Sequence, residues 1–224
     1  MKKSLIILSL FAMIFPVSSH AALVLNGGFE DGLTSWEINK PIVSPTPTGL
    51  VEAKGSWLGV DPYEGSSMAV LAPGSTDDPL AANAGGTGSP MLSQSGFAPD
   101  PFILSFWYNM FGNNRGSGEA GDIFRLWIVG VSGEDVVFER PLADLPGGGP
   151  TTLGWRFFTA VVDLDVSKDI TLNFRVRNDG NSTQNFTAFL DDVSVTPVPE
   201  PGTMMLLGSG LVGLVGWGRK KFRR

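Results

Sequence analysis

Short apolar runs separated by glycine and proline constrain the fold of this chain more than any other feature of its sequence. In residues 170–177 apolar and polar side chains alternate, which is the period of a strand with one buried and one solvated face. No long 3.6-residue pattern occurs outside the C-terminal tail. Comparable runs predict strands at residues 67–72, 102–111, 123–131, 135–140, 155–164, 170–177 and 187–196. We therefore predict an all-β fold, an antiparallel β-sandwich of the jelly-roll kind.

Glycine-rich stretches interrupt these runs at residues 73–101, 113–121 and 146–150. The first stretch is long for a connection in a compact domain, so we expect a functional loop or local disorder there. About 175 residues lie between the two terminal segments of the chain, which is enough for one domain with a substantial core.

The first 21 residues have the composition of a secretory signal peptide. Lys2 and Lys3 form a short basic start, and an apolar stretch follows at residues 5–17. Ser19 and Ala21 are small residues at the two positions that a signal peptidase reads, so we expect cleavage after Ala21.

The residue types that remain after this cleavage exclude several kinds of chemistry. The chain has no cysteine, and its single histidine, His20, lies in the signal peptide. Nucleophilic triads that need histidine, ordinary zinc sites and haem ligation are therefore excluded. Among common enzyme mechanisms, the chemistry of paired carboxylates remains.

The net charge of −6 conceals an asymmetry between the ends of the chain and its body. Two of the 16 basic residues belong to the signal peptide and five to the extreme C-terminus, which leaves nine bases against 22 acids, or −13. A body this acidic repels nucleic acid and anionic lipid, so we expect neither as a partner. It could instead hold calcium.

The tail combines a proline-rich motif, an apolar segment at residues 203–218 and a basic end at residues 219–224. As a helix, its 16 uncharged residues would span roughly 24 Å, slightly less than a hydrocarbon core of about 30 Å. The basic end would stay on the cytoplasmic side. We therefore expect a hydrophobic helix that anchors the chain transiently in the inner membrane.

The order Val198, Pro199, Glu200, Pro201, apolar segment and basic end resembles the PEP-CTERM sorting signal of Gram-negative bacteria. The resemblance implies recognition by an exosortase-type membrane transpeptidase and transfer to the cell surface or the exopolysaccharide matrix. A plain C-terminal membrane anchor is the alternative. The expected organisation is a signal peptide at 1–21, a jelly-roll domain at 22–197 and a sorting signal at 198–224, with its motif at 198–201.

Three stretches of the body resemble galactose-binding-like jelly-roll carbohydrate-binding modules: Asn-Gly-Gly-Phe-Glu-Asp-Gly-Leu-Thr-Ser-Trp at 26–36, Glu-Gly-Ser-Ser-Met-Ala-Val-Leu at 64–71 and Phe-Leu-Asp-Asp-Val-Ser-Val at 189–195. That family commonly carries a structural calcium near the place where its first and last strands meet. By motif position, the resemblance implies Glu30 and Asp191 as calcium ligands, with Asp192 and backbone carbonyls completing six to eight oxygens. Alternatively, these acids lie at solvated strand ends.

Aromatic, amide and guanidinium side chains stand opposite the apolar residues of three predicted strands, 102–111, 123–131 and 170–177. If these strands share a sheet, its outer face carries Trp107, Asn109, Arg125, Trp127, Asn173, Arg175 and Arg177. Flat rings stack on sugars, while amide and guanidinium groups bond hydroxyl pairs or acidic sugars. A covering loop, or strands in different sheets, would remove this face. Trp57 and Tyr63 form a second candidate site, and we assign Trp36 and Trp155 to the core.

The leading functional hypothesis is a non-enzymatic, exported surface or matrix protein whose single calcium-stabilised jelly roll could bind polysaccharide. One alternative is a structural matrix or adhesion protein without glycan specificity. Another is a glycoside-active enzyme, which needs two carboxylates about 5–10 Å apart in a cleft. No acid pair in the sequence stands out for that role.

Overall fold

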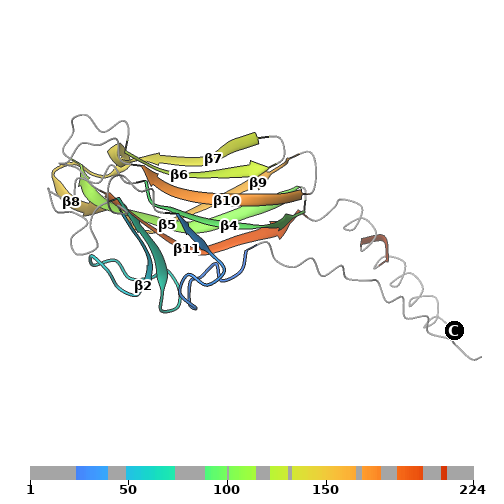
Figure 1. Cartoon of the computed structure of the whole chain (residues 1–224), viewed down its shortest axis with the longest axis horizontal. Helices are drawn as coiled ribbons and strands as arrows, with labels where there is room; N and C mark the ends of the chain where they lie inside the picture. The colour runs from blue at the N-terminus through green and yellow to red at the C-terminus, as the bar shows by residue number, and fades with distance from the viewer. Residues whose placement is uncertain are drawn as a thin grey trace, which may run out of the picture.

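A computed structural model of the chain describes residues 24–39, 49–73, 89–99, 101–114, 122–130, 133–164, 168–177, 186–198 and 208–210. These residues form two antiparallel sheets that pack face to face (Figure 1). The five-stranded sheet has the order β1 (Glu37–Asn39), β4 (Met91–Ala98), β10 (Lys168–Arg177), β6 (Ile123–Gly130) and β7 (Gly133–Pro141). The predicted all-β sandwich is confirmed.

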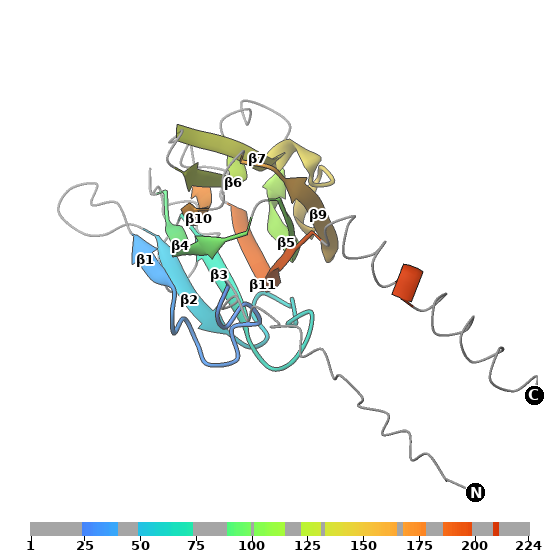
Figure 2. The ribbon, with the colours of Figure 1, turned by 90° about the vertical axis from the view of Figure 1, so that its right-hand side faces the viewer.

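The six-stranded sheet has the order β2 (Leu50–Lys54), β3 (Met68–Ala72), β11 (Phe186–Pro197), β5 (Phe102–Asn114) and β8 (Gly149–Thr152), and β9 (Arg156–Val162) also pairs with β5. A short 3-10 helix, η1 (Leu142–Asp144), follows β7. Figure 2 views the sandwich approximately along its strands, and the edge strands β7 and β9 lie on the same side of it.

Every strand predicted from the sequence is present, and four further strands occur. Strand β4 lies inside the stretch 73–101, so the expectation of a functional loop or local disorder is wrong for residues 91–98, while residues 74–88 lie outside the described residues. Gln94 and Gly96 occupy core-facing positions of this strand, so its sequence does not alternate between apolar and polar residues. The strand pairs with β1 on one side and with β10 on the other, which completes its backbone hydrogen bonds. The proline- and glycine-rich stretch 146–150 likewise leads into β8, which pairs with β5.

The core between the sheets consists of the inward-facing members of the alternating strands. Leu104 and Phe106 on β5, Leu126 on β6 and Phe174 on β10 are fully buried. The ring of Phe106 lies edge-on to those of Phe138 and Phe174, with centroids 5.2 and 5.3 Å apart, and so connects the two sheets. Burying each of these large side chains contributes about 1.5–3 kcal/mol.

The first segment of the domain closes against the last strand. The carbonyl of Gly27 accepts a hydrogen bond from the amide of Val193 at 3.0 Å, and a Cβ on Gly27 would overlap the Val193 carbonyl. The neighbouring Asn26 holds the turn, because its Nδ2 donates to the carbonyls of Gly32 and Thr34. These contacts give a physical reason for the Asn-Gly-Gly motif: the amide fixes the turn, and the missing Cβ permits the approach.

A second, smaller apolar cluster lies on the other side of β3 and β11, outside the core between the sheets. It is covered by residues 57–60 of the β2–β3 connection, where Trp57 and Val60 form an isolated bridge. The buried members of the cluster are Leu50, Val60, Met68, Val70, Ala72 and Phe189.

Candidate functional site

Polar side chains and a tryptophan line the outer face of the five-stranded sheet. In the β6–β10 pairing, Trp127 stands opposite Asn173, and Arg125 stands opposite Arg175. Directly opposed residues of an antiparallel pair lie on the same face, so these side chains share one surface, with Arg177 at the end of β10. The structure thus brings together five of the residues expected to bind a ligand, and their role in binding stays a prediction.

Arg175 and Trp127 form the centre of this surface. The guanidinium carbon of Arg175 lies 4.9 Å from the centroid of the Trp127 ring, within the range of a cation–π contact. The Nε of Arg175 is buried and has no hydrogen-bond partner among the described residues. Burial lowers the pKa of Arg175, and the neighbouring charges of Arg125 and Arg177 lower it further. The surface therefore holds a donor and a charge that the described protein groups do not satisfy.

The groups around this centre are held in place. The Nε of Arg125 donates to the carboxylate of Glu139 on β7 at 2.7 Å. Asn173 is buried, and its Nδ2 donates to the carbonyl of Thr171 at 3.1 Å. On the other side of β10, Ser93 of β4 stands opposite Asn173, so the polar surface continues across a third strand.

Trp107 and Asn109 do not belong to this surface, because β5 lies in the other sheet. Trp107 stands on the outer face of the six-stranded sheet, where the Tyr63 ring stacks on it with centroids 3.7 Å apart and planes inclined by 15°. Asn109 is buried, and its Oδ1 accepts hydrogen bonds from the amide of Met110 and the hydroxyl of Thr152. The condition for one face across all three strands is therefore not met, and the alternative, strands in different sheets, holds for β5. Alternation decides the side on which a residue stands, not the sheet to which its strand belongs.

The loop aromatics gather around Trp107. Tyr63 lies edge-on to Trp155 at 6.0 Å between centroids, and Phe157 of β9 lies 5.0 Å from Trp107. The indole Nε1 of Trp155 donates to the carbonyl of Asp61 at 2.9 Å. These contacts fasten the β2–β3 connection onto the six-stranded sheet, while Tyr63 and Phe157 remain 41% and 52% exposed.

The other three tryptophans in the described ranges divide between the two apolar clusters. Trp36 is buried in the core between the sheets beside Phe29 and Phe174, as predicted. Trp155 packs instead against the smaller outer cluster, which corrects its predicted position. Trp57 belongs to the same outer cluster, with its ring edge-on to Phe189.

Two predicted calcium ligands anchor one loop. The carboxylate of Glu30 accepts hydrogen bonds from the amides of Ser66 and Ser67 and from the Ser66 hydroxyl. These bonds, with the Ser66 hydroxyl first, lower the pKa of Glu30. Asp191 Oδ2 accepts bonds from the amides of residues 63 and 64, and burial raises the pKa of Asp191 to about 6.

Calcium at this place stays a prediction. No three acidic, histidine or cysteine side chains in the described part of the chain form a group that could hold a metal, so Asp192 does not complete the expected set of three carboxylates. Asp192 instead occupies a β-bulge with a φ of 49°. Glu30 and Asp191 would be the two carboxylate ligands, and main-chain carbonyls would have to supply most of the six to eight oxygens. Such an ion would fasten the loop to the last strand.

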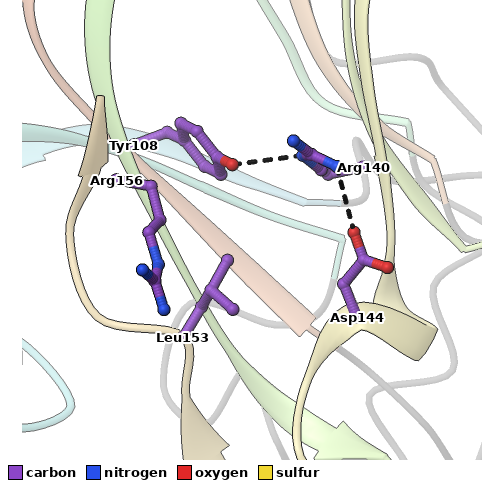
Figure 3. A pocket seen from close by; sticks show the side chains of 5 residues that line it. All are labelled: Tyr108, Arg140, Asp144, Leu153 and Arg156. Carbon is purple, nitrogen blue, oxygen red and sulfur yellow. Dashed lines mark hydrogen bonds and ion pairs between the residues drawn. The ribbon is translucent and has the colours of Figure 1, made fainter. Parts of the chain in front are cut away.

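A cavity of about 430 Å³ between β7 and β9 was not predicted from the sequence. Figure 3 shows its lining side chains: Tyr108, Arg140, Asp144, Leu153 and Arg156. The Nε of Arg140 donates to the Tyr108 hydroxyl oxygen at 3.1 Å, and a second nitrogen lies 3.6 Å from the Asp144 carboxylate. The sequence held one signal for this site: Arg140 and Arg156 are in phase with the inward-facing Phe138 and Phe158 of their strands.

The described residues reach only the start of the sorting motif. Strand β11 ends at Pro197, and the amide of Val198 donates to the Pro101 carbonyl at 3.2 Å. The predicted cleavage position after Ala21 and the motif residues 199–201 lie outside the described residues. Only residues 208–210 of the apolar segment are described, and they are helical. Within the described ranges, no helix has the length and hydropathy needed to span a membrane.

Residues 197–220 match the family model of the PEP-CTERM protein-sorting motif. The predicted sorting signal is therefore confirmed, and the motif indicates an exported protein that an exosortase processes at the cell envelope. No curated protein sequence matches the chain.

The sandwich is similar to solved carbohydrate-binding and adhesin domains. One similar structure is that of TmCBM61 in complex with β-1,4-galactotriose, whose sequence is 17% identical to this chain. The two structures superpose with a TM-score of 0.50, and the match covers 80% of this chain and 100% of TmCBM61. The K1 cleaved adhesin domain of Lys-gingipain from Porphyromonas gingivalis W83 is 16% identical with a TM-score of 0.51, and the match covers 77% and 96%. These similarities show the β-sandwich fold that the three sequence stretches implied.

Proposed function

We propose that this chain is a non-enzymatic surface or matrix protein of a Gram-negative bacterium, and that its sandwich binds polysaccharide on the outer face of the five-stranded sheet. The observation that carries the proposal is Trp127 beside Asn173 and Arg175, with the Arg175 Nε buried and unpartnered among the described residues. An aromatic ring, an amide and a guanidinium on one sheet face are the groups that recognise a sugar.

The spacing of the strands suits a single sugar unit. Neighbouring strands lie about 4.8 Å apart, so Trp127 on β6 and Arg175 on β10 can touch the same pyranose ring. The apolar face of the sugar would rest on the indole surface, while Arg175 bonds its hydroxyls and the buried Asn173 lies beneath them. The ion pair of Arg125 with Glu139 holds the neighbouring side chain before the ligand arrives, which lowers the entropy lost on binding. The exposed Ser95 on β4, which stands opposite Thr171 of β10, extends the surface toward a second unit.

The C-terminal tail would direct the chain to its cellular location. An exosortase-type transpeptidase would recognise the motif at 198–201 while the apolar segment at 203–218 holds the chain transiently in the inner membrane. Release would then place the sandwich on the cell surface or in the exopolysaccharide matrix. The excess of acidic over basic residues in the body favours release from the membrane, since the negative charge of the body is repelled by the anionic membrane surface.

Titration of the full-length chain, purified in mild detergent, with exopolysaccharide and a glycan set tests this function. Tryptophan fluorescence is followed, and β-1,4-galactotriose is included because TmCBM61, which shares the fold, was solved with it. A saturable change supports the proposal. If no glycan binds saturably, the chain is better described as a structural matrix protein without glycan specificity. Release of reducing sugar would instead identify a glycoside-active enzyme.

A further inference from the structure

Three polar side chains point toward the interior of the sandwich at one end, where the core would otherwise continue. Tyr108 on β5 and Arg156 on β9 are opposed residues, and Arg140 on β7 is opposed to the buried Phe124 of β6. Arg140 and Arg156 therefore stand on the inward sides of edge strands that belong to different sheets. Both arginines are exposed at this end of the sandwich, so their guanidinium groups remain open to a ligand from solvent.

The cavity between these side chains has unsatisfied donors. The Tyr108 oxygen accepts the bond from Arg140, so its own hydrogen remains to be donated, and none of the described residues accepts it. Tyr108 as a whole is only 4% exposed, and its side chain lines the cavity. Arg156 forms no ion pair within the described ranges, and Figure 3 shows its guanidinium beside Leu153 with no dashed contact.

The one acid at the cavity does not neutralise the two arginines. Asp144 lies 3.6 Å from Arg140, and both side chains are about half exposed, so their ion pair is weak. Two guanidinium groups and a phenolic hydroxyl form a donor-rich end that fits a carboxylate. The Asp144 carboxylate can accept hydroxyl hydrogens, and Leu153 offers an apolar wall to a ring.

We propose that this cavity, formed by Tyr108, Arg140, Asp144, Leu153 and Arg156, binds a uronic acid unit of an acidic polysaccharide. The guanidinium groups and the tyrosine hydroxyl hold the sugar carboxylate, and Asp144 accepts bonds from its ring hydroxyls. The volume of about 430 Å³ lies within the range of small-molecule sites, roughly 300–1,000 Å³. This site is distinct from the outer face of the five-stranded sheet and does not depend on the function proposed for that face.

Calorimetric titration of the full-length chain with trigalacturonate tests the proposal, and β-1,4-galactotriose serves as the uncharged comparison. We expect saturable binding of trigalacturonate that weakens as salt is added. Arg156→Gln should reduce its affinity about tenfold or more, because a charge-assisted hydrogen bond is lost. Lys54→Gln, which removes one positive charge from β2, should leave the affinity unchanged.

Two further arms separate this site from the outer face and from a general anion site. Trp127→Ala should leave trigalacturonate binding intact even where it abolishes binding of a neutral glycan, so the two proposals fail independently. Glutamate, a carboxylate without a sugar ring, should not compete at the same concentration. The proposal would be overturned if trigalacturonate does not bind, or if Arg156→Gln and Lys54→Gln lose the same amount of affinity for it. It would also be overturned if glutamate competes with trigalacturonate at the same concentration.

Discussion

The guanidinium carbon of Arg175 lies 4.9 Å from the centre of the Trp127 ring, and its Nε is buried without a partner among the described residues. A lysine at this position would keep a charge but lose the planar fork that can bond two hydroxyls. We expect Arg175→Lys to weaken glycan binding about tenfold while leaving the unfolding midpoint in urea nearly unchanged. Full retention of affinity in this variant would mean that only charge matters at this position.

The close approach of Gly27 to the last strand predicts a large cost for a single methyl group. A Cβ on Gly27 would overlap the Val193 carbonyl, whereas one on Gly28 would meet no atom within 4 Å. We expect Gly27→Ala to lower the free energy of unfolding by about 2–4 kcal/mol, and Gly28→Ala to change it by less than about 0.5 kcal/mol. Urea unfolding measures both. Equal effects of the two substitutions would refute the contact.

The buried carboxyl of Asp191 predicts a dependence of stability on pH. Its pKa is raised from 3.8 to about 6 by burial, so the folded state holds the proton more tightly than the unfolded state. The stability from this group is therefore fully present below its unfolded pKa and is lost as the pH rises through about 6. We expect the free energy of unfolding to fall by at most about 3 kcal/mol across this interval.

Asp191→Asn should flatten this part of the pH profile, because the titrating group is removed. Glu30 acts in the opposite direction: its pKa is lowered from 4.5, so its contribution is present above that value and lost as the pH falls. Urea unfolding at a series of pH values above about 4.5 therefore isolates Asp191. If the free energy of unfolding of Asp191→Asn depends on pH as steeply as that of the parent chain, another group is responsible for the pH dependence.

The predicted calcium can be tested at the loop that Glu30 and Asp191 anchor. We expect calcium to raise the Tm by a few degrees and a chelator to reverse the rise, because an ion that binds only the folded state stabilises it. Glu30→Gln should remove the response, and Glu52→Gln, which deletes an equal charge on β2, should keep it. If the Tm of the parent chain ignores calcium, Glu30 serves only as the hydrogen-bond acceptor of Ser66 and Ser67.

Local alternation made the strands and the facing of each residue predictable. It placed Phe106, Phe124 and Phe174 on inward sides, where all three are fully buried. It could not assign strands to sheets, because β5 and β6 follow each other in sequence but belong to opposite sheets. Trp107 and Trp127 therefore have the same local pattern yet stand on different faces of the molecule.

The residues that the sequence concealed share one property, which is a polar or small side chain at an inward position. Gln94 on β4 made that strand look like a loop, although its amide is buried and bonded to both the amide and the carbonyl of Leu25. Arg156 on β9 is an exposed residue, and only the approach of β7 from the other sheet makes it part of the lining of a cavity. Such positions depend on contacts between distant strands, which periodicity does not encode.

Binding of glycan beside Trp127 on the five-stranded sheet can be tested by comparing the glycan affinities of three chains. The parent chain, Trp127→Ala and Trp107→Ala are titrated with the glycan that binds best, and the urea midpoint of each is recorded. We expect at least about a tenfold loss of affinity in Trp127→Ala, whereas Trp107→Ala should keep its affinity although it loses the stacking contact with Tyr63. Retained affinity in Trp127→Ala together with loss in Trp107→Ala would contradict this expectation and place the binding face on the six-stranded sheet.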